Sequence, residues 1–455
     1  MKTLIAFAIA ASCSLACAIE PTASERTPTG GKADDAIELR PGAIDWANEP
    51  DRLDSHYVRT YRDLPRSGAA SRVPWTDTYW PKNQGGISDR WQTGEHFGYT
   101  SPSLSELQGM TADEIAKLSP TEKYDIFVGN YHYSLTSAVQ GQNSATEASW
   151  QGYCHGWTPA SIHFAEPHPV TVTNPDGITI QFGSADVKAL LTYFQGEVVT
   201  SLWSDDIHPF QKPARVLGTL CSGKNALAPS CYDANPGAFH IVMANQLGLR
   251  RQAFGIDAVN GYEKWNQPVH RFSATELEHR TPSPGAAASA VDEVVIRAQV
   301  TYVQEIHATW DAVGGTAQHS DTTKTYSYTL ELDAGGDIVG GQWLYVFDDG
   351  GDMTYQAVYD YFATVDENGD GSPDLNRAEI AQQMLSLFDF PDYVWRADKA
   401  EFSPTFAPSY SSWSFVATTR TTKWALYKYM SYLRPLHQLS VGETPDYPSV
   451  EGDDS

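Results

Sequence analysis

The sequence predicts an α+β fold built around more than one hydrophobic core. At 455 residues the chain exceeds the ~250–300 residues at which single cores stop growing. Hydrophobic residues make up 41% of it, which is enough to fold most of the chain, whereas 35 Gly and 27 Pro favour many turns over long helices. Residues 292–310 and 324–343 alternate polar and apolar around an Ala-Gly-Gly-Asp turn and predict an antiparallel sheet.

The N-terminus has the pattern of a secretory signal peptide. One Lys precedes an apolar run that is too short to cross a bilayer, and small residues follow this run. Ala16 and Ala18 form an A-x-A motif, so residues 1–18 are the expected signal with cleavage after Ala18; lipidation of Cys17 is the alternative. No later run is apolar enough for a transmembrane helix. We therefore expect a secreted protein, or one anchored at the cell surface by lipid.

Composition divides the rest of the chain into four regions. Residues 19–45 are polar and turn-forming, which predicts a disordered linker or a pro-segment. Residues 46–140 contain helix-capping signals such as Thr111 and predict an N-terminal helical region. Residues 141–280 are expected to hold the reactive groups. Residues 281–455 begin with a Pro- and Ala-rich linker and are predicted to form a β-rich C-terminal region.

The chain is strongly acidic, with 31 Lys and Arg against 56 Asp and Glu and a formal charge of −25. Such a surface repels phosphate backbones and anionic lipid headgroups, so we expect no nucleic-acid partner. The acidity suits a secreted protein, or one that lives in salt. It also supplies carboxylates for a hard cation such as calcium.

Three cysteines follow the expected signal, and three cannot all pair. Gly, Asn and Pro between Cys221 and Cys231 let the chain turn back, so these two are the expected disulfide in an oxidising compartment. Cys154 is then left over. An unpaired thiol in an exported protein requires a reason, because it risks oxidation and wrong pairing.

Cys154 is either a packed core thiol or a nucleophile. Gly152 and Gly156 flank its Tyr-Cys-His run, and the Thr-Pro-Ala-Ser-Ile segment that follows is a plausible helix start. A thiol at a helix N-terminus meets the positive end of the helix dipole, which lowers its pKa and favours the reactive thiolate. Since a free Cys also packs well as a small hydrophobe, both interpretations stay open from these residues alone.

A cysteine nucleophile needs a histidine to take its proton and usually a third group to orient the ring. His240 follows a Pro-Gly turn in an apolar run that predicts a buried strand, and Asp257 lies on the next predicted strand. Adjacent strands can bring these two side chains together; Asn266 is the alternative orienting residue. The order Cys154, His240, Asp257 is the papain-like arrangement and predicts a papain-like catalytic core over residues 141–280.

Residues 365–376 contain oxygen ligands at alternate positions around a Gly turn, as in a calcium-binding EF-hand loop. The five expected ligands are Asp366, Asn368, Asp370, Ser372 and Asp374. Arg377 stands where the loop normally has a bidentate Glu, so the pattern is similar to an EF-hand without matching it fully. The alternative is a surface turn rich in Asp and Asn. A calcium site here would stabilise structure rather than take part in chemistry.

Several uncommon strings resemble the transglutaminase elicitor family, the Pep-13-containing, calcium-dependent transglutaminases of oomycetes and marine bacteria. The Pep-13-like segment is residues 261–276, in which the matching positions are Trp265, Asn266, Gln267, Pro268, Val269, Phe272 and Glu276. The other strings are SWQGYCHGWTPASI, DVKALLTYF, DANPGAFHIVMANQLG and FPDYVWRAD. In order, they extend the resemblance from about residue 90 to about residue 400.

The resemblance implies a calcium-dependent protein-glutamine γ-glutamyltransferase with a papain-like core, acting on proteins that carry Gln and Lys side chains. It assigns the nucleophile to Cys154 and is consistent with His240 as base and Asp257 as orienting residue. Lys264 and two other positions of the Pep-13-like segment, His270 and Arg271, depart from the oomycete pattern, so plant elicitor activity is not implied. The string FPDYVW also lacks the His expected before its Pro-Asp pair.

Two rival functions use the same sequence features. The same triad would serve a secreted papain-like cysteine peptidase or a glutamine deamidase, because the chemistry differs only in which carbonyl the groove admits and how well it excludes water. A non-catalytic surface adhesin or effector that kept the fold is the third possibility.

Overall fold

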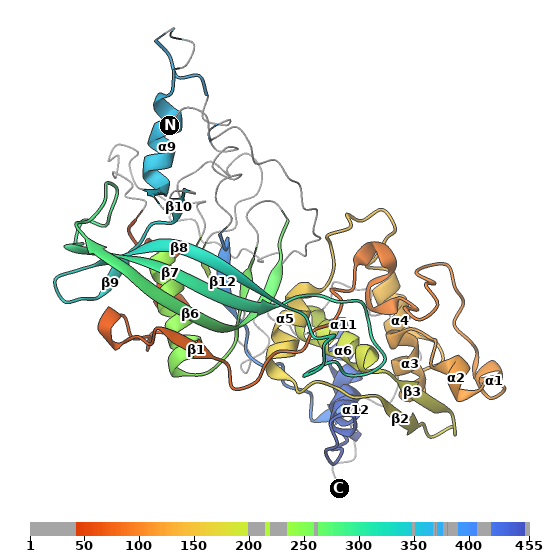
Figure 1. Cartoon of the computed structure of the whole chain (residues 1–455). Helices are drawn as coiled ribbons and strands as arrows, with labels where there is room; N and C mark the ends of the chain where they lie inside the picture. Colours follow the sequence, from red (N-terminus) through yellow and green to blue (C-terminus); the bar gives the residue numbers. More distant parts are fainter. Residues whose placement is uncertain are drawn as a thin grey trace.

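The computed structural model describes residues 42–198, 214–218, 234–258, 263–347, 351–366, 369, 371–375, 380, 390–406 and 420–450. These residues form two lobes, a helical lobe on the right and a sheet lobe on the left of Figure 1. Residues 1–41, including the expected signal peptide and Cys17, lie outside the described residues, as do Cys221 and Cys231.

The helical lobe is made of short helices, two small strand pairs and three short turns of 3-10 or π helix. Its helices are α1 (Leu104–Leu107), α2 (Ala112–Ile115), α3 (Pro120–Phe127), α4 (Ser134–Gln140), α5 (Cys154–His163), α6 (Ser184–Tyr193), α11 (Arg420–Tyr429) and α12 (Leu433–Ser440). Its strand pairs are β2 (Val170–Thr173) with β3 (Thr179–Phe182), and β13 (Thr405–Phe406) with β14 (Ser449–Val450). The turns are η4 (Gly86–Ser88), η5 (Phe194–Val198) and η9 (Met430–Tyr432).

Capping boxes start three successive helices of this lobe, which explains why such short segments are helical. Ser103, Thr111 and Ser119 each accept a hydrogen bond from the backbone of the Glu three residues on, and that Glu accepts one from the backbone of the cap. The expected helical region and its Thr111 cap are therefore found, although the segment before α1 is mostly irregular and contains η1 (Pro50–Arg52), η2 (Tyr61–Asp63) and η3 (Lys82–Gln84).

Helix α5 is held against α6 and η5 by a close approach of two glycines. A Cβ on Gly156 would lie 2.1 Å from the carbonyl oxygen of Thr192, and a Cβ on Gly196 would lie 2.7 Å from the Cα of Gly156. Only glycine permits this spacing without a shift of one element. The first turn of α5 is thereby fixed in a core that includes Trp157 and Tyr193.

The sheet lobe is built on an antiparallel sheet of eight described strands in the order β4-β12-β5-β6-β7-β8-β9, with β1 also paired to β6. The strands are β1 (Ser67–Ala69), β4 (Arg215–Gly218), β5 (Phe254–Asp257), β6 (Asn266–Arg280), β7 (Asp292–Val303), β8 (Asp321–Leu332), β9 (Ile338–Gly340) and β12 (Tyr393–Arg396). The remaining elements of this lobe are α8 (Pro236–Met243), η8 (Ala244–Leu249), β10 (Leu344–Val346), β11 (Asp352–Thr354) and α9 (Tyr355–Thr364). Helix α8 packs on β8 and β9.

The predicted antiparallel pairing is confirmed, since β7 and β8 pair along their whole length and β9 returns after the Gly-containing turn.

Two domain boundaries differ from expectation. Residue 280 falls between the paired strands β6 and β7, so residues 141–280 and 281–455 share one sheet. At the other edge, the part of the 19–45 segment that the structure describes is not disordered: Ala43 forms a bridge with Gly340, because the unpaired edge of β9 offers it backbone partners.

The predicted strand around His240 is wrong. Residues Pro236–Met243 form helix α8, whose N-cap Asn235 accepts hydrogen bonds from the backbone of Gly237 and Ala238. Pro236 occupies the first turn, where its missing N–H is not needed. Every residue of this helix is buried, so its sequence is apolar on all sides and lacks the periodicity that distinguishes helix from strand.

Candidate active site

Cys154 lies where the two lobes meet. It is the first residue of α5 and is fully buried. Its Sγ accepts a hydrogen bond from Nδ2 of Asn266 at 3.4 Å and lies 4.0 Å from the carbonyl oxygen of Lys264, to which the thiol donates. Both partners belong to the segment at the start of β6, so the helical lobe supplies the sulfur and the sheet lobe supplies its polar contacts.

Asn266 is held by three elements at once. Its Oδ1 accepts a hydrogen bond from the hydroxyl of Tyr393 on β12 at 2.9 Å, and its backbone carbonyl accepts one from the hydroxyl of Thr158 on α5 at 2.7 Å. With Oδ1 engaged, the amide nitrogen is directed at Cys154. The sequence proposed Asn266 as an alternative partner of a histidine; the structure instead places it directly against the sulfur.

Two carboxyl groups act on the sulfur through their charge. Asp257 ends β5, faces Asn266 across the β5–β6 pair and accepts a hydrogen bond from the backbone N–H of Trp265 at 2.6 Å. Glu305 follows the end of β7 and accepts a hydrogen bond from Nε2 of Gln267 at 2.8 Å. Burial raises the pKa of Glu305 to about 7, which is within the range of a general acid or base at neutral pH.

The thiol of Cys154 is not activated in this geometry. Burial raises its pKa well above the usual value, the hydrogen bonds from Asn266 lower it, and the charges of Glu305 and Asp257 raise it further. The expectation that the helix N-terminus lowers this pKa is wrong here, because loss of hydration and two nearby carboxylates outweigh the dipole. A base must therefore take the thiol proton before the sulfur can attack.

The structure does not bring His240 to Cys154. The Nδ1 of His240 lies 2.8 Å from the hydroxyl of Tyr328, and its ring lies against those of Tyr61 and Tyr328 in the core of the sheet lobe. Burial lowers the pKa of His240 to about 4, so the ring is neutral at pH 7. Of the three residues of the predicted triad, Cys154 and Asp257 lie near each other, and the described contacts of His240 join neither of them.

The calcium-binding prediction is only partly covered by the described residues. Asp366, Ser372 and Asp374 are described and exposed, whereas Asn368 and Asp370 lie outside the described residues. The carboxylate of Asp366 accepts hydrogen bonds from the backbone N–H groups of Gly369 at 2.7 Å and Gly371 at 2.8 Å. This closes the loop around a carboxylate, a geometry compatible with calcium and also with a simple Asx turn. Among the residues that the structure describes, no cluster of three or more His, Cys, Asp or Glu could hold a metal ion.

Two residues at this site were missed in the sequence. Tyr393 lies in the FPDYVW string, and Glu305 lies within residues 292–310, which were predicted to belong to the antiparallel sheet. Each of them lies at the end of a strand. The order in which these strands pair cannot be read from the sequence: β12 and β5 are neighbours although they are far apart in the chain. An acidic residue at the end of a long buried strand was the available signal for Glu305.

Comparison with known proteins agrees with the fold. The chain resembles the crystal structure of the GP42 transglutaminase from Phytophthora sojae with a TM-score of 0.51 and 21% identity, over 86% of this chain and 99% of that one. At this identity the likeness establishes a shared α+β fold. Comparison with curated protein sequences gave no match. Within the described part of the chain, no helix combines the length and apolar character needed to cross a bilayer.

The sequence model of the transglutaminase elicitor family matches residues 53–353, about two thirds of the chain, and includes Cys154, Asn266 and Glu305. This protein belongs to the transglutaminase elicitor family, and this membership supports a transglutaminase-like function.

Proposed function

We propose that the protein is a secreted protein-glutamine γ-glutamyltransferase, which joins Gln and Lys side chains of protein substrates through a thioester on Cys154. The observation that carries this proposal is a single cysteine at a helix start, placed between two lobes and contacted by a fixed amide, in a chain of this family. The apolar N-terminal run with its A-x-A motif supports export.

In the proposed reaction, the Cys154 proton passes to a base as Sγ attacks the carboxamide carbon of a substrate glutamine. The base returns the proton to the leaving nitrogen, ammonia departs and a thioester remains. A lysine amine then attacks the thioester carbon, gives up its proton and regenerates the thiol, leaving an isopeptide bond. Water in place of the amine would yield deamidation.

Asn266 is suited to support the oxyanion of this reaction. The tetrahedral intermediate places negative charge on the former carboxamide oxygen, which requires hydrogen-bond donors close to the sulfur. The N–H of Asn266 already points at Sγ, and Tyr393 fixes the opposite end of the amide. Little reorganisation of this donor would be needed when the substrate arrives.

Two residues compete for the role of base. His240, with Asp257 as its orienting residue, follows from the sequence; it requires a rearrangement that separates His240 from Tyr328. Glu305 follows from the structure, because its charge acts on Cys154 and its pKa of about 7 suits proton transfer. Variants His240→Gln and Glu305→Gln separate the two. Loss of at least about a hundredfold in kcat with only one of them identifies the base.

Calcium and a disulfide are proposed as structural supports. Calcium would be held by Asp366, Asn368, Asp370, Ser372 and Asp374, and the disulfide would join Cys221 and Cys231. Neither group touches the reacting atoms in this proposal. A chelator should therefore lower the melting temperature, with any loss of rate following from that.

The test measures incorporation of an amine-bearing dye into a glutamine-rich protein together with ammonia release. The wild type should do both, and Cys154→Ala should lose both by at least about a thousandfold with an unchanged circular dichroism spectrum. Ammonia release without incorporation of the dye would favour a glutamine deamidase. Peptide-bond cleavage without incorporation of the dye would favour a cysteine peptidase. A Cys154→Ala variant as active as the wild type would contradict the role of Cys154 as nucleophile. A folded wild type with neither dye incorporation, ammonia release nor peptide cleavage would leave the non-catalytic adhesin or effector.

A further inference from the structure

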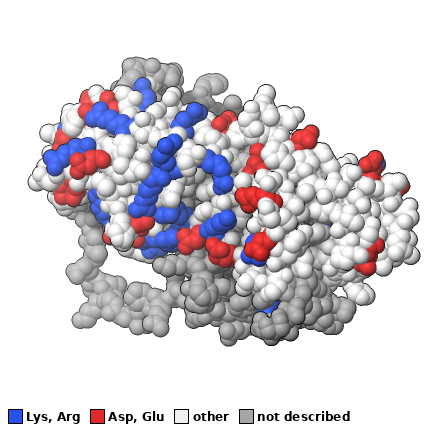
Figure 2. Space-filling view, turned by 90° about the horizontal axis from the view of Figure 1, so that it is seen from below, with Lys and Arg blue, Asp and Glu red and all other residues white. Residues whose placement is uncertain are grey.

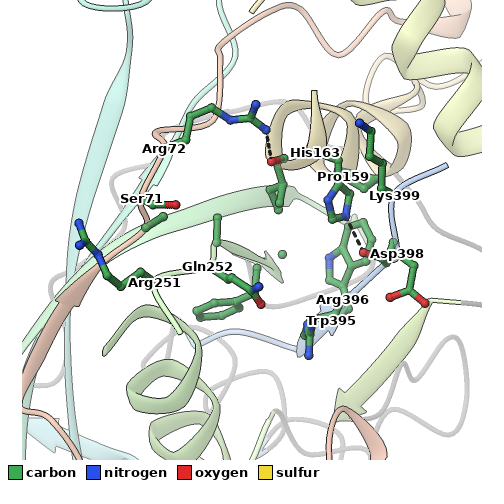
Figure 3. A pocket seen from close by; sticks show the side chains of 16 residues that line it. Ser71, Arg72, Pro159, His163, Arg251, Gln252, Trp395, Arg396, Asp398 and Lys399 are labelled. Atoms are coloured by element: carbon green, nitrogen blue, oxygen red, sulfur yellow. Dashed lines mark hydrogen bonds between the residues drawn. The ribbon is translucent and has the colours of Figure 1, made fainter. Parts of the chain in front are cut away.

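A second cavity lies behind the candidate active site, at the opposite ends of the same elements (Figure 3). It has a volume of about 440 Å³ and is lined by the second half of α5, the start of β5 and the end of β12. Cys154, Asp257 and Tyr393 occupy the other ends of these three elements and do not line it. This cavity is called the basic pocket below.

The charge of the basic pocket is opposite to that of the protein. Four cationic side chains line it, Arg72, Arg251, Arg396 and Lys399, in a chain whose formal charge is −25. Asp398 is its single lining carboxylate, and this group already accepts a hydrogen bond from Nη2 of Arg215 at 2.7 Å. Figure 3 shows that Arg72, Arg251 and Lys399 lie on different sides of the pocket.

The described contacts of Arg72 include no carboxylate, and Arg396 shares its carboxylate partner with Arg250. Arg72 donates to the backbone carbonyl of Ile162, and partial burial lowers its pKa, as expected for a cation without a nearby carboxylate. Arg396 lies 3.6 Å from Asp54, whose carboxylate is already bound by Arg250 at 2.6 Å. The indole Nε1 of Trp395, on a side chain only 2% exposed, has no hydrogen-bond partner among the described residues.

The backbone around Arg251 is strained to hold this residue in place. Its φ of 56° lies in the left-handed region, which a residue with a long side chain rarely adopts. The conformation is fixed because the carbonyl of Arg251 accepts a hydrogen bond from the backbone N–H of Ser71 at 2.8 Å. Such strain persists where the surrounding structure over-determines it, and it concentrates at functional sites.

We propose that the basic pocket binds a small molecule that carries a phosphate or sulfate group. Arginines that line one cavity from separate elements suit a tetrahedral oxyanion, because a guanidinium fork can donate two parallel hydrogen bonds to it. The volume accommodates a small organic phosphate and is too small for a folded partner.

The wider surface is consistent with attraction of an anion to this region. Figure 2 views the molecule from below, the side on which β1 lies in Figure 1. Lys and Arg side chains gather there over the sheet lobe and the centre of the molecule, whereas scattered Asp and Glu dominate the helical lobe. Segment 70–72, which follows β1, lines the basic pocket. An anion approaching this side would meet a positive local field despite the negative net charge.

Isothermal titration with inorganic pyrophosphate, sulfate and citrate tests the proposal on the full chain without its signal. Pyrophosphate and sulfate should bind saturably, and citrate more weakly. The variants Arg72→Gln and Arg251→Gln should each weaken pyrophosphate binding about tenfold, and 0.5 M NaCl should weaken it in the wild type. Arg62→Gln is the matched control, since this exposed arginine lies outside the pocket; it should bind as the wild type does.

The melting temperatures of all variants, measured without ligand, verify that they are folded. If Arg72→Gln is unstable, Arg72→Lys takes its place and should retain part of the wild-type affinity for pyrophosphate. Absence of saturable pyrophosphate and sulfate binding to the folded wild type would overturn the proposal. Equal affinity of the two pocket variants and the control would also overturn it. Cosedimentation with phosphatidylglycerol vesicles is a further measurement. If the wild type sediments with the vesicles, the pocket variants do not, and pyrophosphate fails to bind, the pocket is a lipid-headgroup site instead.

Discussion

The helical lobe and the sheet lobe bury their polar groups in different ways. In the helical lobe, Lys123 and Asp186 form an ion pair in which neither side chain is exposed, and Lys188 pairs with Glu166 at 2.7 Å. In the sheet lobe, the polar ring of His240 is buried neutral, and its described hydrogen bond is to the hydroxyl of Tyr328. The helical lobe thus fixes its helices with buried charge pairs, whereas the sheet lobe combines this neutral ring with an ion pair of Arg280 and the buried Glu293 across β6 and β7 at 2.6 Å.

The difference matches what each lobe contributes to the site. Short helices have little stability of their own, so directional contacts such as the Lys123–Asp186 pair define how α3 and α6 sit against each other. Helix α5, which carries Cys154, packs on this assembly. The sheet lobe is ordered by backbone pairing and needs no such contacts to place Asn266 at the start of β6.

The largest effect is expected from breaking the buried charge pair. Lys123→Met would leave Asp186 as an unpaired buried charge, although Nε1 of Trp91 still donates to it at 2.9 Å. The free energy of unfolding should fall by about 3–5 kcal/mol, measured by urea titration. Lys117→Met, at an exposed position of the same region, is the control and should change it by less than ~0.5 kcal/mol. If Lys123→Met lowers the free energy of unfolding as little as Lys117→Met does, the Lys123–Asp186 pair does not stabilise the helical lobe.

A smaller effect is expected at the glycine contact that positions α5. Gly156→Ala would place a methyl group 2.1 Å from the carbonyl oxygen of Thr192, so α5 must move away from α6. We expect a loss of about 2 kcal/mol in the free energy of unfolding and a drop in transferase activity, because Cys154 moves with α5. Gly109→Ala, where the nearest atom is at 3.4 Å, should retain wild-type stability and activity. Full activity in Gly156→Ala would mean that the position of α5 does not limit the reaction.

The smallest effect is a pH dependence of opposite sign at two buried groups, Asp125 in the helical lobe and His240 in the sheet lobe. Burial raises the pKa of Asp125 to about 7, so its folded form holds a proton that the unfolded form has lost, and its contribution to stability falls as pH rises from about 4 to 7. The pKa of His240 is lowered to about 4, so the contribution of this residue rises with pH between about 4 and 6.5.

Urea titrations from pH 4.5 to 7.5 check both signs. As pH rises across this range, the free energy of unfolding of the wild type should fall by at least ~1 kcal/mol relative to that of Asp125→Asn. Relative to that of His240→Phe, it should rise by a similar amount. The prediction is wrong if these differences between wild type and variant stay constant with pH. It is also wrong if they change in the same direction for Asp125→Asn and His240→Phe.

The local structure of the site could be predicted from sequence better than its assembly. Alternation and turn residues located the strands β5, β7 and β8. The Thr-Pro-Ala-Ser-Ile segment indicated a helix after Cys154, and the structure starts this helix, α5, at Cys154 itself. The segment containing His240 could not be assigned by periodicity, because a helix buried on every side and a buried strand have the same apolar composition. Asn235 followed by Pro236 was the usable helix-start signal.

The partners of Cys154 depend on strand order, which sequence does not display. β12 lies between β4 and β5, although long stretches of chain separate the three, and this order brings Tyr393 to Asn266. Glu305 reaches the site because β7 runs antiparallel to β6 and ends near its start. The predicted pair of buried strands favoured His240 as the partner of Cys154, whereas the observed strand pairing favours residues contributed by β6, β12 and the end of β7.

The hydrogen bond between Tyr393 and Asn266 has a consequence for self-protection. In the proposed function the enzyme attacks side-chain carboxamides, and one of its own, on Asn266, lies within reach of its sulfur. Because the tyrosine hydroxyl retains the oxygen of that amide, the sulfur faces an unreactive nitrogen instead of an electrophilic carbon. Resistance to self-acylation is thus built into the orientation of a single amide group.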